Sequence, residues 1–109
     1  MTSIIQVTTT VSDPADAERI AAWLVAQRLA ACVQISGPIE STYRWKGQVE
    51  TSQEWVCAIK TRAELFAEVE QVIRGLHSYG EPEIMAVPIT AASAGYRDWL
   101  LESVKSTAG

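Results

Sequence analysis

The feature that most constrains the fold is a pair of long extended runs on either side of Lys46-Gly47. The run from Ala31 to Trp45 would span about 50 Å at about 3.3 Å per residue. The run from Gln48 to Lys60 contains no proline or glycine, and Lys46-Gly47 supplies a two-residue turn, so the pattern predicts a long hairpin. A globule of this length has a radius of gyration of about 13 Å, so we expect the hairpin to project beyond its own domain.

Pairing across that turn predicts which side chains share a face. Tyr43 should oppose Glu50, and Trp45 should oppose Gln48. One face of the hairpin is then predicted to carry Tyr43, Trp45, Glu54, Val56, Ala58 and Lys60, and the other to carry Trp55, Cys57 and Ile59. Gly37-Pro38 predicts a bulge or bend in the first strand.

Both faces of the predicted hairpin carry apolar groups. One face can cover the protein's own helices, and the other is free to meet the sheet of a second subunit. Self-association is therefore expected. The alternative is a bent hairpin that folds back onto its own core.

The rest of the chain reads as one α+β domain over residues 1–109. Ile4 to Val11 is typical of a strand, and Asp13-Pro14 starts a helix that ends near Arg28. Thr61 and Glu64 match a capping box before a second helix that reaches Leu76. Glu83 to Ile89 favours a last strand on an open edge, and Ser93 is expected to cap a final helix with Tyr96, Trp99, Leu100 and Val104 inward.

The order of these elements predicts the topology. A β-α-β-β-α-β order with an extra C-terminal helix is the split βαβ arrangement, in which right-handed crossovers place both helices on one face of an antiparallel sheet. The fold class is therefore predicted to be ferredoxin-like α+β.

Composition excludes several classes of function. A formal charge of -4 and a pI near 4.9 leave no excess positive charge for nucleic acid. No apolar run approaches the roughly 18 to 20 residues that span a bilayer, and Met1 to Gln6 does not resemble a signal peptide, so we expect a soluble, cytoplasmic protein. Cys32 and Cys57 are predicted to lie about 13 Å apart along the strands, which leaves both thiols free.

Ionisable residues concentrate after the second predicted helix. His77, Tyr79, Glu81 and Glu83 could bind a divalent cation or act as acid and base. The alternative is a polar loop that closes a helix. Lys60, at the end of a strand, is expected to need a carboxylate, and Glu54 and Glu83 are the candidates for an ion pair.

The chain resembles a known family at several segments in order. They are Ala30 to Ile35, Ser41 to Gly47, Glu54, Ile59-Lys60-Thr61, His77 to Ile84, and Tyr96 with Trp99. These segments are similar to those of the CutA divalent-cation tolerance proteins. The resemblance implies a ferredoxin-like subunit in a tight homotrimer, and cytoplasmic binding of copper or other divalent cations. It also implies an intersubunit cleft formed by Cys32, Tyr43, Trp45, Glu54, Lys60, His77, Tyr79 and Glu83.

This sequence departs from the family pattern at the copper ligands. A cysteine late in the first strand corresponds to Thr9, and the first histidine of a His-His pair corresponds to Leu76, so His77 alone remains. A proline that commonly precedes the loop tyrosine is Ser78. We therefore expect a weak site of His77 with Glu81 or Glu83, more suited to zinc than to selective copper.

Three functions of different classes fit the sequence. The first is a trimeric metal-tolerance protein without catalytic turnover, and the second is a trimeric small-molecule sensor similar to the PII-type signalling proteins. The two-residue turn at Lys46-Gly47 leaves no long loop for such a sensor, and no glycine-rich phosphate cradle is present. The third is an enzyme that uses Lys60, Glu54 and His77 in an intersubunit cleft. The non-catalytic protein is the prediction.

Overall fold

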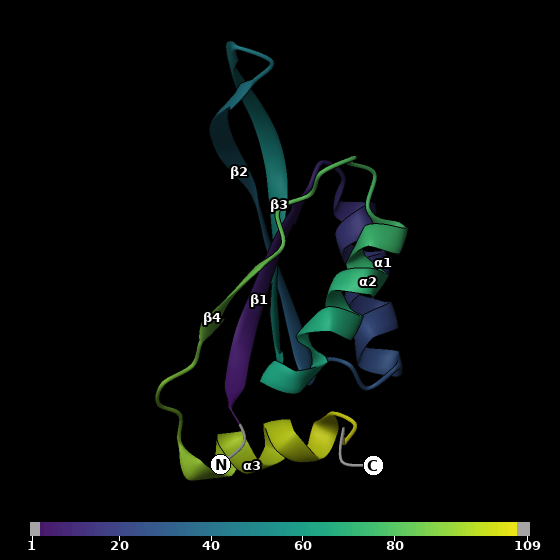
Figure 1. Ribbon diagram of the computed structural model, residues 1–109, viewed down its shortest axis with the longest axis vertical. Helices are drawn as coiled ribbons and strands as arrows, with labels where there is room; N and C mark the ends of the chain where they lie inside the picture. Colours follow the sequence, from purple (N-terminus) through teal and green to yellow (C-terminus); the bar gives the residue numbers. More distant parts are fainter. Residues whose placement is uncertain (1–2, 107–109) are drawn as a thin grey trace.

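A four-stranded antiparallel sheet organises the computed structural model, which describes residues 3–106. Its order is β2-β3-β1-β4. The elements are β1 (Ile4–Val11), α1 (Pro14–Ala26), β2 (Cys32–Trp45), β3 (Gln48–Arg62), the 3-10 turn η1 (Ala63–Leu65), α2 (Phe66–Leu76), β4 (Met85–Pro88) and α3 (Ala94–Ser103). Helices α1 and α2 lie side by side against the sheet, and α3 crosses below it (Figure 1). The predicted ferredoxin-like α+β fold is confirmed.

The β2-β3 hairpin extends well beyond the helices (Figure 1), and the molecule measures 45 × 26 × 21 Å. Tyr43 pairs with Glu50 and Trp45 with Gln48, as predicted. The turn residues Lys46 and Gly47 have φ values of 50° and 78°, which suit the twist of a tight hairpin. The long hairpin therefore has the register that its sequence indicates.

A bulge interrupts β2 at Gly37-Pro38, again as predicted. The pairing shifts between Ser36 and Ile39, and Gly37 has a φ of 150°. A Cβ atom at Gly37 would lie 2.6 Å from Cδ1 of Trp55, so only glycine fits there. Cys32 and Cys57 are offset by three positions along the ladder, because Cys32 pairs with Lys60 and Ile35 with Cys57. Both cysteines are free, as predicted.

The core lies between one face of the sheet and helices α1 and α2. Its fully buried members include Val7, Val11, Ile20, Leu24, Cys57, Ile59, Val69 and Ile73. The opposite face carries the side chains that alternate with these in register. On that face Met85 and Val87 are 54% and 50% exposed in the single chain.

The second helix begins later than the capping-box prediction. Thr61 still belongs to β3, where it pairs with Ile5, and its hydroxyl donates to Leu29 O at 2.6 Å instead of capping a helix. The helix α2 starts at Phe66, after η1. Strand pairing and a buried hydroxyl partner thus override the local capping pattern.

The C-terminal part of the chain also differs from the prediction. Strand β4 is shorter than Glu83–Ile89, and Ser93 makes no side-chain cap. Of the four residues predicted to point inward, Leu100 and Val104 are buried in the core, whereas Tyr96 and Trp99 are 40% and 45% exposed. Periodicity identified the helix but not which of its apolar side chains one subunit buries.

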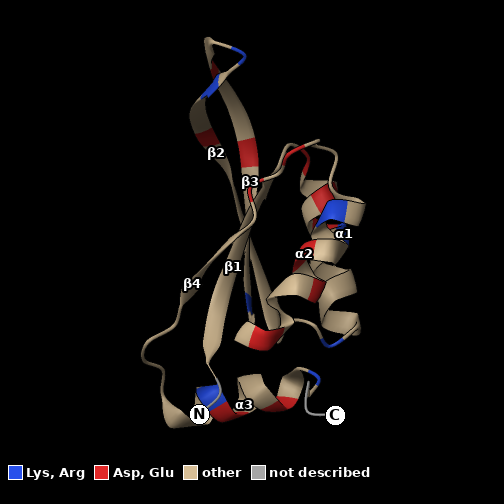
Figure 2. Cartoon of the chain, in the orientation of Figure 1, with Lys and Arg blue, Asp and Glu red and all other residues tan. Residues whose placement is uncertain are grey.

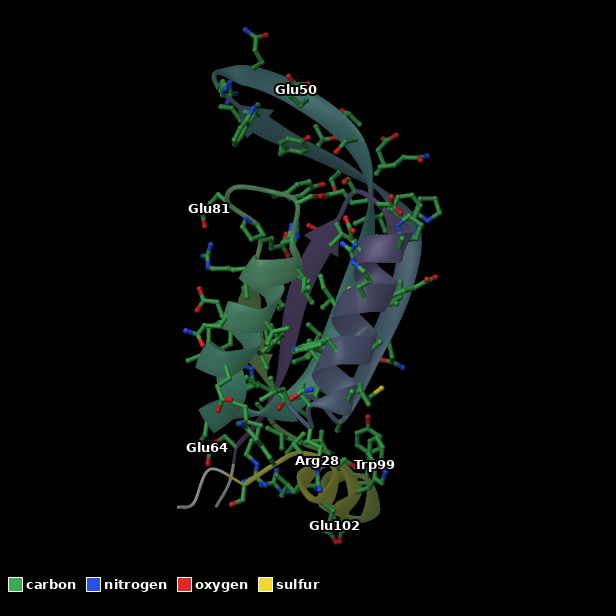
Figure 3. The ribbon with its side chains drawn as sticks, turned by 90° about the vertical axis from the view of Figure 1, so that its right-hand side faces the viewer. Arg28, Glu50, Glu64, Glu81, Trp99 and Glu102 are labelled. Atoms are coloured by element: carbon green, nitrogen blue, oxygen red, sulfur yellow. The ribbon has the colours of Figure 1, made fainter. Side chains whose placement is uncertain are left out.

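Two arginines hold the end of α3 on the rest of the domain. Arg28 donates to Glu102 O at 2.6 Å and to Ser103 O at 3.3 Å, and Arg62 donates to Leu101 O at 3.2 Å. These carbonyls have no partner within the last turn of a helix. Figure 3 shows Arg28 directed toward the helix that carries Glu102.

Candidate binding cavity

A cavity of about 730 Å³ lies where the projecting hairpin meets the loop between α2 and β4. It is lined by Thr10, Ser41, Thr42, Tyr43, Trp45, Glu54, Tyr79, Gly80, Glu81, Pro82 and Glu83. Strand alternation after the bulge places Tyr43, Trp45 and Glu54 on one face of the hairpin. Tyr43 and Trp45 remain 43% and 56% exposed in the single chain.

Glu54 forms the buried acidic group of this cavity. Its exposed fraction is 8%, and the Tyr79 hydroxyl donates to Oε2 at 2.8 Å. Burial, followed by the hydrogen bond to Glu54, raises the pKa of Tyr79 to about 12. Tyr79 is therefore a neutral donor to Glu54 throughout the physiological pH range.

His77 fixes the loop that brings Tyr79 to the cavity. Its Nδ1 accepts from the Tyr79 backbone N–H at 3.1 Å, so the ring proton lies on Nε2, 2.7 Å from the accepting Thr10 O. The rings of His77 and Tyr79 also pack with centroids 4.7 Å apart. Both ring nitrogens are thus engaged, and His77 anchors the loop to β1.

The structure brings most of the predicted cleft residues together within one chain. Those that line the cavity are Tyr43, Trp45, Glu54, Tyr79 and Glu83, with Glu81 from the predicted metal set. Cys32 and Lys60 lie farther along the sheet, where they pair with each other. His77 supports the lining without belonging to it.

The predicted ion pair of Lys60 with Glu54 or Glu83 is wrong for the single chain. Lys60 Nζ donates to Gln34 Oε1 at 2.5 Å, and Lys60 enters no ion pair among residues 3–106. Lys60 lies six positions after Glu54 in β3, which is about 20 Å along a strand. The partner of Glu54 in this chain is Tyr79, not Lys60.

The single chain does not assemble the predicted metal set of His77, Glu81 and Glu83. Within the described residues no three His, Cys, Asp or Glu side chains are grouped to hold a metal ion. His77 is engaged by backbone, and Glu81 accepts from Arg74 at 3.3 Å. Glu81 and Glu83 do share the lining of the cavity.

Sequence reasoning missed several lining residues, including Thr10, Ser41 and Pro82. Register could have found Thr10, because it pairs with Val56, next to Glu54 in the ladder. Pro82 gives no comparable signal, since loop closure brings it to the cavity.

The cavity is acidic and aromatic. Three glutamates and three aromatic side chains line it, and its lining includes no lysine or arginine. Figure 2 shows acidic segments of the chain near the base of the projecting hairpin, where the cavity lies. Such a lining favours cations over anions.

Outside the cavity, a hollow of about 240 Å³ between α1 and α2 is lined by Trp23, Gln71, Val72, Gly75 and Leu76. No helix in the described part of the chain is long and apolar enough to cross a membrane.

Comparisons with known proteins agree with this architecture. Residues 5–103 match the family described as "CutA1 divalent ion tolerance protein". "Divalent-cation tolerance protein CutA" of Archaeoglobus fulgidus is 43% identical over 83% of this chain and 87% of its own length. "Protein CutA 1, chloroplastic" of Oryza sativa is 36% identical over 94% of this chain and 58% of its own length.

A solved structure of "the Periplasmic divalent cation tolerance protein CutA from Archaeoglobus fulgidus" superposes with a TM-score of 0.88. Its sequence is 40% identical, and the alignment covers 96% of this chain and 100% of that chain.

Proposed function

The chain belongs to the CutA1 divalent ion tolerance protein family, and we propose that it is a homotrimeric, non-catalytic protein that binds divalent cations weakly. The observation that carries the cation proposal is the cavity lined by Glu54, Glu81 and Glu83 without a lysine or arginine. Carboxylate oxygens bind divalent cations of many kinds and give little preference for copper. Copper and zinc are both expected ligands, with low selectivity.

Trimer formation is supported by exposed apolar surface on the projecting part of the sheet. Val49 is 65% exposed and Trp45 is 56% exposed, and Met85 and Val87 extend apolar surface over the open face. A monomer would leave these side chains and the outer edge of β2 in water. Light scattering on a sizing column should give about three times 11.9 kDa, and a persistent monomer would contradict the proposal.

Calorimetric titration of metal-stripped protein with zinc and with copper tests the cation proposal. Glu83→Gln removes a charged donor from the cavity and should weaken binding of both metals several-fold. Glu64→Gln is the matched control, because Glu64 is exposed on η1, far from the labelled Glu81 (Figure 3). A tight copper site that survives Glu83→Gln and His77→Ala would contradict the proposal and point to Cys32 or Cys57.

A small-molecule sensor is the second candidate, and the size of the cavity favours it. About 730 Å³ lies within the range of about 300 to 1,000 Å³ that is typical of small-molecule sites and far exceeds the space that one metal ion needs. A thermal-shift screen of nucleotides and other metabolites would identify such a ligand, since a ligand of the native state raises the Tm.

We place the protein in the cytoplasm, a proposal supported by two free cysteines, which suit a reducing compartment. The relatives include proteins named as chloroplastic and as periplasmic, so family membership does not determine the compartment. Cell fractionation of the source organism would test this.

A further inference from the structure

The cavity walls combine ring faces with negative charge. Tyr43, Trp45 and Tyr79 supply the rings, and Glu54 supplies a carboxylate that is 8% exposed. Aromatic faces attract cations through the ring quadrupole, most strongly where water is excluded. The aromatic rings have no use in holding a metal ion through oxygen ligands.

The Trp45 ring already holds an ammonium group in this structure. Lys46 Nζ of the same chain lies 5.7 Å from the ring centroid. That distance is within the range of about 6 Å over which a cation is attracted to the face of tryptophan. Because Trp45 is 56% exposed in the single chain, its own subunit leaves much of the ring uncovered.

Glu54 has one oxygen that is free for a ligand. Tyr79 donates to Oε2, and no hydrogen bond among residues 3–106 ends on Oε1. A buried carboxylate is costly unless a charged or polar partner compensates it. Tyr79 is a neutral partner, so the charge of Glu54 is left for a cation to balance.

Size decides between kinds of cation. A cavity of about 730 Å³ accommodates an organic molecule, whereas a single metal ion would leave most of it to water. An anion would meet three glutamates, and a neutral ligand would leave Glu54 uncompensated.

We propose that the cavity binds a small organic ammonium ion, with its cationic head between the rings of Tyr43 and Trp45 and the carboxylate of Glu54. This inference goes beyond the proposed function. It depends on the aromatic walls together with Glu54, whereas metal binding depends on Glu54 together with the loop carboxylates Glu81 and Glu83.

Calorimetric titration of the full chain with choline and with its neutral isostere 3,3-dimethylbutan-1-ol tests the charge requirement at constant ionic strength. The two probes have nearly the same shape and differ in charge. Choline should bind at least about tenfold more tightly than the alcohol. This difference in affinity is what one strong cation–π contact together with ion pairing would give. Equal affinities, or no binding of choline up to 10 millimolar or so, would overturn the proposal.

Variants then locate the site. Trp45→Leu, in which leucine keeps an apolar side chain on the hairpin, should weaken choline binding about three- to thirtyfold in protein whose size by light scattering matches that of the wild type. Trp99→Leu is the matched control, because Trp99 is 45% exposed but lies on α3 at the opposite end of the molecule from Glu81 (Figure 3). If the two variants have the same effect, the walls of this cavity do not bind choline.

Glu54→Gln gives a second test that does not remove a large side chain. The amide oxygen can still accept from Tyr79, so the fold should persist while the compensating charge is lost. Choline affinity should fall at least about tenfold in a variant whose size and Tm match those of the wild type. Unchanged affinity would overturn the role of Glu54.

Zinc titrations of the same variants separate this inference from the proposed function. Trp45→Leu should leave zinc binding unchanged, and Glu83→Gln should weaken zinc more than choline. Binding of choline without zinc would remove the cation-tolerance proposal and keep this one. Binding of zinc without choline would do the reverse.

Discussion

Removing the Tyr79 hydroxyl tests how firmly the loop after α2 is tied to the hairpin. In Tyr79→Phe the ring and its packing on His77 remain, whereas Glu54 loses its donor at Oε2. A hydrogen bond to a charged group contributes about 1.5–3 kcal/mol, and leaving a buried partner unsatisfied costs its desolvation as well. Because Glu54 is buried, we expect the free energy of unfolding per subunit to fall by about 1.5–3 kcal/mol.

Urea denaturation at fixed protein concentration, with light scattering to establish that the assembly is unchanged, measures this loss. Tyr96→Phe is the matched control, because Tyr96 is 40% exposed and its hydroxyl has no hydrogen bond among the described residues. The control should change the free energy of unfolding by less than about 0.5 kcal/mol. Equal effects of the two substitutions would refute the reasoning.

The pKa of Tyr79 gives the same experiment a pH signature. Its folded-state pKa of about 12 lies above the unfolded value near 10. The stabilisation is therefore fully present below pH 10 and is lost as the pH rises from about 10 through about 12, because the folded state holds this proton more tightly. The stability difference between wild type and Tyr79→Phe should shrink over that window. A difference that is constant up to pH 12 would contradict the assignment.

Three further substitutions test the fold and the proposed assembly. Arg28→Gly relieves a positive φ of 59° but removes two hydrogen bonds to the end of α3. The free energy of unfolding, measured by thermal unfolding, should therefore fall by about 1–2 kcal/mol. A gain in stability would show that the Arg28 contacts contribute little. Gly37→Ala should destabilise the protein by more than about 2 kcal/mol, because its Cβ would lie 2.6 Å from the Trp55 side chain. Gly75→Ala, in open space on α2, should be neutral or stabilising. Similar Tm values for the two variants would be inconsistent with the close contact. Trp45→Ala should shift the proposed trimer toward monomer more than Trp23→Ala does, because Trp45 is on the projecting hairpin and Trp23 borders the helical layer. Equal monomer fractions by light scattering would contradict a hairpin interface.

The backbone of this protein follows from its sequence because local rules act together there. The turn at Lys46-Gly47 sets the register, and strict alternation then places Tyr43, Trp45 and Glu54 on one face without knowledge of the rest of the fold. The same alternation buries Cys57 and Ile59 under the helices. Fold class and the hairpin wall of the cavity were predictable for this reason.

The other wall of the cavity depends on loop closure, which has no period. Tyr79 and Glu54 are 25 residues apart, and nothing in either local segment selects one as the partner of the other. A charge rule paired Glu54 with Lys60, which lies on the same face of the same strand. Strand geometry forbids that contact, since side chains six residues apart along a strand lie about 20 Å from each other.

His77 shows how one residue type can serve two roles that sequence does not separate. An imidazole near two glutamates favours a metal site, but its Nδ1 and Nε2 face the Tyr79 N–H and the Thr10 carbonyl instead. The ring thereby ties the loop to β1, so that the Tyr79 hydroxyl reaches Glu54 on β3. Glu54 lies two positions from Val56, which pairs with Thr10. The shape and charge of the cavity thus depend on His77, although His77 does not line the cavity.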